Sequence, residues 1–441
     1  MSGFQRNRKN KISMKNVIVI GGGLAGSEAA YYLLKEGFSV TLVERRPKVS
    51  DGAHETPYFG ELVCSNSLKS KKLDNACGLL KEEMRSLGSL MMEVAEKTEV
   101  PAGNALSVDR LSFAKEITKK LKSFPNFDVR SEECVSLPKD VPAILATGPL
   151  TNGPLLEAIS SLVGAKNLSF FDASAPIVKK ESIDFSIAYY KSRFEQDDAA
   201  YINCPMNKEQ YYTFVTELVN AKRATLHEFD THYFEGCMPL EVMASRGIET
   251  LRHGPLKPFG LEKEKGDRPY AVIQLRQDNM LGDLYNIVGF QTNLTYPEQK
   301  RVFSLIPGLE RAEFVRYGLM HRNSYINSPL ALNEDLSLVA LPNVLVAGQL
   351  TGVEGYVESA AIGIVAGINM ARKLTSKVPL DVPEETVLGA LIDYILHAKG
   401  RYFSPMNANW ALFPTSKKET RNVTIEASLE AIKSYSKCIH E

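Results

Sequence analysis

Three glycines near the N-terminus have the spacing of a phosphate-binding turn. The motif Gly21-x-Gly23-x-x-Gly26 follows the apolar run 17–20 and opens a segment with helical spacing. Gly21 permits the tight turn, Gly23 lets the backbone approach a pyrophosphate, and Gly26 lets helix and strand pack closely. The start of the helix offers free N–H groups to phosphate oxygens. The candidate nucleotide site is therefore the loop made of Gly21, Gly22, Gly23, Leu24, Ala25 and Gly26.

An acidic residue completes this motif. Glu44 ends the next apolar run, 40–43, and its carboxylate could accept hydrogen bonds from ribose hydroxyls. The glycine spacing alone is weak evidence, but strand, loop, helix, strand and acid all fall within about thirty residues. The alternative, a tight turn with no ligand, is disfavoured by this full context.

Two later strands favour FAD over NAD. The apolar runs 143–146 and 344–347 each end in small or polar residues, namely Thr147 and Gly148 in the first case and Gly348 and Gln349 in the second. A second crossing toward a flavin is expected at such strand ends. Many two-part flavoproteins have an aspartate at the place of Gln349, and a glutamine can still hydrogen-bond the ribityl chain.

These residues require an α/β fold. Buried parallel strands with flanking helices predict a Rossmann-like FAD-binding domain, interrupted by a smaller α+β insertion domain where apolar runs shorten and aromatic residues become frequent. We expect a disordered leader at 1–13, an FAD-binding domain from 14–165 and 335–441, and an insertion domain at 166–334. Helices are predicted at 27–36, 69–92 and 359–373.

Composition narrows the class of protein. The 441 residues carry 52 basic and 52 acidic side chains, which excludes a uniformly basic nucleic-acid binder but allows a local basic patch. The six cysteines have no Cys-x-x-Cys spacing, so no zinc ribbon or other metal site is expected. Dispersed cysteines, no secretory signal and no membrane-spanning run predict a cytoplasmic protein with free thiols.

Several blocks in the same order resemble the folate- and FAD-dependent uracil-5 RNA methyltransferases, the TrmFO family, which is related to the wobble-uridine-modifying flavoproteins. They are GGGLAGSE at 21–28, ELVCSNSL at 61–68, GLLKEEMR at 78–85, VPAG at 100–103, ATGPL at 146–150, FEGCM at 234–238, RPYAVIQLRQ at 268–277, YNIVGFQT at 285–292, MHRN at 320–323, GQLTGVEGYVES at 348–359 and PMNAN at 405–409.

The resemblance implies a reductive methylation. A one-carbon unit from 5,10-methylenetetrahydrofolate is placed on C5 of a uridine, usually in the T-loop of tRNA, with reduced FAD as the hydride source and NADH or NADPH re-reducing the flavin. Ribosomal RNA as the substrate, a wobble-uridine modifier that works with a GTPase, and a non-methylating flavoprotein that binds tRNA are the alternatives. No obligatory protein partner is indicated.

Two cysteines match the functional thiols of that family, Cys64 in ELVCSNSL and Cys237 in FEGCM. Carbon 5 of uracil becomes nucleophilic only after a group adds at C6, and a thiolate can add there and leave again. We assign Cys237 as the C6 nucleophile and Cys64 as the thiol near the flavin, and the swapped assignment stays open. The other four cysteines are expected to be small core or surface residues.

Supporting residues are less specific. Glu354 and Tyr356 could contact the flavin or folate, and a role at the start of a helix is an equal alternative. His321 and Arg322 could donate to folate or phosphate, and Arg276 could bind the folate carboxylate or form an ordinary salt bridge. Basic residues that could form a phosphate-binding face are Lys69, Lys71, Lys72, Arg110, Lys119, Lys120, Arg246, Arg252 and Lys257.

Overall fold

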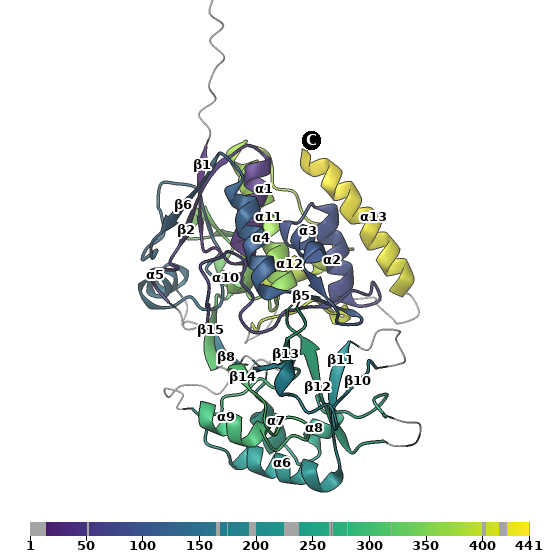
Figure 1. Cartoon of the computed structure of the whole chain (residues 1–441). Coiled ribbons are helices and arrows are strands. Elements are labelled where there is room, and N and C mark those ends of the chain that lie inside the picture. The colour runs from purple at the N-terminus through teal and green to yellow at the C-terminus, as the bar shows by residue number, and fades with distance from the viewer. Residues whose placement is uncertain are drawn as a thin grey trace, which may run out of the picture.

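The structure is a computed structural model of the chain. It describes residues 15–50, 53–164, 168–173, 175–193, 200–224, 238–263, 266, 268–279, 281–318, 320–398, 403–413 and 421–440, with the backbone alone at 168–173 and 320–322. Two hydrophobic cores organise these residues. The upper part of the molecule in Figure 1 contains both ends of the described chain, and the lower part contains the middle of it.

The upper part is an α/β fold built on a six-stranded sheet. The strand order is β16-β17-β7-β1-β2-β6, and all neighbours are parallel except β16. The short apolar strands lie at the centre because both of their faces are covered, as buried parallel strands require. Their bounds are β1 Asn16–Ile20, β2 Ser39–Glu44, β6 Phe127–Ser131, β7 Ala143–Leu145, β16 Ser337–Leu338 and β17 Leu341–Val346.

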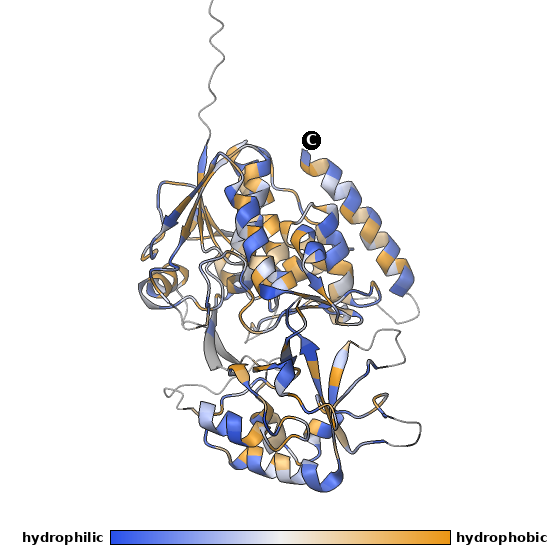
Figure 2. Cartoon of the chain, viewed as in Figure 1, coloured by the Kyte–Doolittle hydropathy of each residue, from blue (hydrophilic) through white to orange (hydrophobic). Residues whose placement is uncertain are grey.

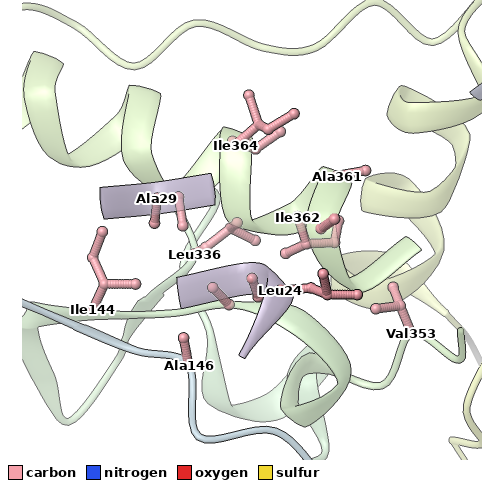
Figure 3. Packing of buried hydrophobic residues seen from close by; sticks show 14 of the residues in the cluster. Leu24, Ala29, Ile144, Ala146, Leu336, Val353, Ala361, Ile362 and Ile364 are labelled. Carbon is pink, nitrogen blue, oxygen red and sulfur yellow. The ribbon is translucent and has the colours of Figure 1, made fainter. Parts of the chain in front are cut away.

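Two helices from opposite ends of the chain pack against each other beside this sheet. They are α1, Leu24–Lys35, and α11, Tyr356–Leu374. Figure 3 shows Leu24 and Ala29 of α1 in one packed cluster with Ala361 and Ile362 of α11. This contact joins the N-terminal and C-terminal segments in one core, so residues more than 300 positions apart contribute to the same wall.

The region 67–97 differs from the single helix predicted over 69–92. It contains β3 (Ser67–Ser70), α2 (Ala76–Ser86) and α3 (Leu90–Lys97). Asn75 caps the start of α2 by accepting a hydrogen bond from the Cys77 amide, and Gly88, with φ of 75°, separates the two helices. The segment has helical periodicity, but the Asn75 cap and the left-handed Gly88 divide it into two helices. Strand β3 joins β5 (Ala105–Val108) and β4 (Glu99–Val100), followed by α4 (Arg110–Lys122).

The lower part has a second six-stranded sheet, of order β10-β11-β12-β13-β9-β14, with antiparallel neighbours. Its core is the second hydrophobic cluster, which draws on residues 175–312. The strands are β9 Ile177–Lys179, β10 Tyr189–Tyr190, β11 Tyr201–Met206, β12 Ala271–Gln277, β13 Leu284–Ile287 and β14 Phe314–Arg316, and the helices are α6 Lys208–Asn220, α7 Leu240–Ser245, α8 Thr250–His253 and α9 Tyr296–Phe303.

The chain passes between the two parts in a two-stranded ladder. Strand β8 (Leu168–Ala173) pairs antiparallel with β15 (Met320–Tyr325), and Figure 1 shows both strands between the upper and lower parts. The remaining helical elements are α5 Gly153–Val163, η1 Lys180–Ser182, α10 Ser328–Ala331, η3 Gly348–Thr351 and η4 Trp410–Leu412.

Two C-terminal helices complete the upper part, α12 (Val387–His397) and α13 (Arg421–His440). Helix α13 buries residues at helical spacing, and Figure 2 shows hydrophilic and hydrophobic residues alternating along it, as expected of a helix packed by one face. No helix among the described residues is both long and apolar enough to cross a membrane.

Candidate functional site

Of the three motif glycines in the loop between β1 and α1, two are closed against the protein and one is open. Gly21 has φ of 103°, and a Cβ atom there would lie 2.5 Å from the carbonyl oxygen of Ala146. A Cβ atom at Gly26 would lie 2.0 Å from the carbonyl oxygen of Gly21 and would separate helix from strand. A Cβ atom at Gly23 would meet no atom within 4 Å. The open side of the loop therefore faces a space that a ligand can enter.

Glu44 lies at the end of β2, beside this loop. Its carboxylate accepts hydrogen bonds from the backbone amide of Gly22 at 2.8 Å and from the backbone amide and Nε of Arg46 at 3.0 Å. Burial by itself would raise the pKa of Glu44, but the hydrogen bonds and charge of Arg46 outweigh it and lower the pKa. Glu44 is thus held as an ionised acceptor at the wall of the site.

These groups line a cavity of about 360 Å³, which is in the size range of small-molecule sites. The sequence-predicted residues that line it are Cys64 and all of the proposed cofactor residues except Gly26, that is Gly21, Gly22, Gly23, Leu24, Ala25, Glu44, Thr147, Gly148, Gly348, Gln349, Glu354 and Tyr356. Cys134 also lines the cavity, which its sequence context did not indicate. Arg276 is not among the lining residues.

The second return segment brings another helix N-terminus to the cavity. Helix α11 begins at Tyr356, directly after Gly355 with φ of 122°. The side-chain amide nitrogen of Gln349, Nε2, donates to the Glu354 carboxylate, so these two side chains are held together at the wall. The N-termini of α1 and α11 both reach the cavity, and each offers unpaired N–H groups and the positive end of a helix dipole.

This donor set fits a flavin dinucleotide. The open glycine loop and two helix N-termini suit a pyrophosphate, and the ionised Glu44 suits a ribose. Polar and apolar side chains both line the walls between them, and most of the lining surface is apolar, which suits a planar ring system. Among the described residues, no group of three or more His, Cys, Asp or Glu side chains could hold a metal ion.

Cys64 lies in this cavity within hydrogen-bond reach of the half-buried Tyr356. The Sγ atom is 3.0 Å from Oη of Tyr356, and the same phenol oxygen accepts a hydrogen bond from the Cys64 backbone amide at 2.8 Å. Burial first, and then the charge of Cys64, raise the pKa of Tyr356 well above its ordinary value. Tyr356 therefore stays protonated at neutral pH and is available as a hydrogen-bond donor.

Two arginines lie beneath the Cys64 loop. Arg276 donates to Oγ of Ser65 at 2.8 Å and to the amide oxygen of Asn66 at 3.2 Å. Arg110, which the sequence suggested for a phosphate-binding face, instead forms an ion pair with Asp278 at 3.1 Å. Sequence reasoning missed this role because Asp278 is 168 positions away and no motif links them.

The other predicted residues divide into two groups. Cys237 lies outside the described residues, and so do the side chains of His321 and Arg322 in β15. The candidate basic face is largely paired with acids. The ion pairs are Lys69–Glu358, Lys71–Glu99, Lys119–Glu116, Lys120–Glu93 and Arg252–Glu249.

Comparison with known proteins identifies related families and structures. The family model described as glucose inhibited division protein A matches residues 16–378. A protein from Lactobacillus johnsonii named methylenetetrahydrofolate--tRNA-(uracil-5-)-methyltransferase TrmFO is 55% identical over 425 residues, which are 95% of this chain and 97% of that one. A TrmFO from Desulforudis audaxviator is 56% identical over 400 residues, covering 90% of this chain and 91% of that protein.

The chain belongs to the TrmFO family of GidA-related flavoproteins. A solved structure of Aquifex aeolicus GidA shares the fold, with a TM-score of 0.70 at 18% identity over 96% of this chain and 76% of that chain. Membership of the TrmFO family agrees with the resemblance found in the sequence blocks, and the GidA likeness agrees with the predicted α/β flavoprotein fold.

Proposed function

We propose that the protein is a methylenetetrahydrofolate- and FAD-dependent methyltransferase that forms 5-methyluridine in the T-loop of tRNA. The observation that carries this proposal is the position of Cys64, which opens into the same cavity as the glycine loop. A thiol beside a dinucleotide site is what flavin-dependent transfer of a one-carbon unit to uracil requires. Relatives that are 55% identical over nearly their whole length are named for this activity.

Bound FAD supplies the reducing equivalents, and NADH or NADPH restores them. The chain's own residues would hold the cofactor: Gly23 and the start of α1 would bind the pyrophosphate, Glu44 would bind a ribose, and Gln349 and Glu354 would hold the ribityl and flavin region.

The two thiols have separate roles, one in activating the uracil and one in the transfer of the one-carbon unit. Cys237 adds to C6 of the uracil and is expelled after the methyl group is complete, while Cys64, beside the flavin, takes part in or protects the one-carbon transfer. Tyr356 supports Cys64 through its hydrogen bond at 3.0 Å. We further propose that 14–165 and 335–441 form the FAD-binding domain and 166–334 the insertion domain, because the two hydrophobic cores follow this division closely.

The test is a direct assay. Purified protein is incubated with unmodified tRNA transcript, labelled methylenetetrahydrofolate and NADH, and the digested RNA is analysed for 5-methyluridine. We expect label in the T-loop uridine, and loss of it in Cys64→Ala but not in Cys438→Ala, whose thiol is exposed on α13 outside the cavity. We propose that the reaction takes place in the cytoplasm, which contains both tRNA and folate.

Other outcomes would change the proposal in distinct ways. Label in ribosomal RNA and none in tRNA would replace the substrate. Absence of label in both RNAs, with FAD bound, would contradict the methyltransferase itself. Full methylation activity of Cys64→Ala would remove this thiol from the mechanism and leave the methyltransferase activity itself in place.

A further inference from the structure

The surroundings of Cys64 contain a largely buried cation, Arg110, that has no role in the proposed reaction so far described. Arg110 is the first residue of α4, and its Nη1 donates to the carbonyl oxygen of Leu62 at 2.8 Å, two positions before Cys64. Its Nε lies 3.1 Å from both carboxylate oxygens of Asp278. Its Nη2 is buried and has no hydrogen-bond partner among the described residues.

A buried guanidinium nitrogen without a partner is costly, because its lost hydration is not replaced. Burial by itself would lower the pKa of Arg110, but the charges of Asp278, Tyr356 and Cys64 raise it, so the side chain stays charged. Two of these three groups, Tyr356 and Cys64, belong to the Cys64 site. A negative charge on the Cys64 sulfur would compensate the unpaired Nη2 of Arg110.

Tyr356 adds a second donor. Its phenol oxygen already accepts the backbone amide of Cys64 at 2.8 Å and, more weakly, that of Ser65 at 3.5 Å. With its oxygen acting as acceptor, its own proton is the one left to point at Sγ, 3.0 Å away. A hydrogen bond donated to sulfur stabilises the thiolate relative to the thiol.

We propose that Arg110 is a positioning residue that holds Cys64 as a thiolate at neutral pH, together with the proton donated by Tyr356. Asp278 and Arg276 are two further charged groups close to this loop, and the Arg46–Glu61 and Lys69–Glu358 ion pairs flank it in sequence. Asp278 belongs to the lower part of the molecule and partly neutralises Arg110, so the charge at Cys64 depends on contact between the two parts. Arg276 is held beneath the loop by Ser65 and Asn66.

The proposal rests on the proposed role of Cys64 as a reactive thiol, but its test needs neither folate nor RNA. The FAD-loaded protein is treated briefly with iodoacetamide over a pH series. Alkylation of Cys64 is then measured by mass spectrometry on the tryptic peptide 49–69, in which Cys64 is the sole cysteine. The readout is the midpoint of the pH profile, which slow access through the flavin site does not move.

Arg110→Gln should shift this midpoint upward by about one pH unit or more, which is about a tenfold fall in the acid dissociation constant of the thiol. Tyr356→Phe should shift it in the same direction by less. Arg110→Lys should keep most of the wild-type profile, because it retains the charge. Arg301→Gln, which removes a surface arginine paired with Glu298 and Glu217, is the matched control and should leave the midpoint unchanged.

Asp278→Asn distinguishes an electrostatic role from a merely structural one. Asparagine keeps one acceptor for Arg110 but removes the negative charge, so the midpoint should move downward, opposite to Arg110→Gln. An unchanged midpoint in a folded, FAD-binding Arg110→Gln protein would overturn the proposal. If that variant does not fold, an upward shift or no shift in Asp278→Asn would overturn it equally. Failure of the methylation assay with the expected midpoint shifts would contradict the proposed function alone.

Discussion

At the scale of single residues, a buried carboxyl at Glu28 connects two helices. Glu28 is in α1 and accepts hydrogen bonds from the side chain of Ser89 and from the backbone amides of Leu90 and Met91 at the start of α3. Burial is the largest influence and raises the pKa of Glu28 to about 7, against the lowering effect of these hydrogen bonds. The residue therefore caps a helix and also makes stability depend on pH.

The sign of that dependence follows from the raised pKa. Between about pH 4.5 and 7 the unfolded chain loses this proton while the folded chain retains it, so the free energy of unfolding falls as pH rises. The shift corresponds to about 3 kcal/mol. Glu28→Gln should flatten this slope in urea unfolding at pH 5, 6 and 7, and the exposed Glu430→Gln should not. An equally steep slope in Glu28→Gln would contradict the raised pKa.

At the scale of elements, the start of α1 can be tested separately from its packing. Gly23 has open space on its side-chain side and no positive φ, so Gly23→Ala should leave the melting temperature of the FAD-free protein nearly unchanged. The added methyl group would stand where a pyrophosphate approaches, and FAD affinity should fall by about tenfold or more. Flavin fluorescence titration measures the affinity, and equal affinity would show that the ligand does not approach Gly23.

The contact between α1 and α11 gives a prediction about stability. A Cβ atom at Gly363 would lie 2.3 Å from the carbonyl oxygen of Ala25, a contact that the backbone must move to relieve. Gly363→Ala should therefore lower the free energy of unfolding by about 1–3 kcal/mol. Gly367→Ala, one turn further along α11, has its nearest contact at 3.1 Å and should cost less. Urea unfolding of both variants measures the difference, and the reverse order would contradict this packing.

At the scale of the whole molecule, the Cys64 loop is held between the two parts. Arg276 in β12 of the lower part donates to Ser65 and Asn66 of the upper part, and Asn66 donates to the backbone oxygen of Gln277 at 2.9 Å. Arg276→Met should loosen the loop and lower kcat for methylation by about tenfold or more while FAD still binds. The surface variant Arg301→Met is the control. Wild-type kcat in Arg276→Met would show that the loop needs no support from the lower part.

Some of this site could be predicted from local sequence, because its chemistry is carried by neighbours in the chain. The glycine loop, the acid at Glu44 and the return segment at Gly348 each follow a strand, and parallel strands bring their carboxyl ends to one edge. The prediction of a single helix over 69–92 is partly wrong, because Asn75 caps the start of one helix and Gly88 separates it from the next. Periodicity cannot detect such breaks.

Local sequence motifs are enough to predict the fold class, the family and most of the proposed cofactor residues at the cavity wall, since each depends on a run of contiguous residues. The roles of Arg110 and Arg276, in contrast, depend on the folded arrangement of the two parts. Their partners, Asp278 for the first and Ser65 and Asn66 for the second, lie on the other part of the molecule. A charged side chain looks the same in a sequence whether it faces solvent or a buried acid, because its burial is set by long-range packing.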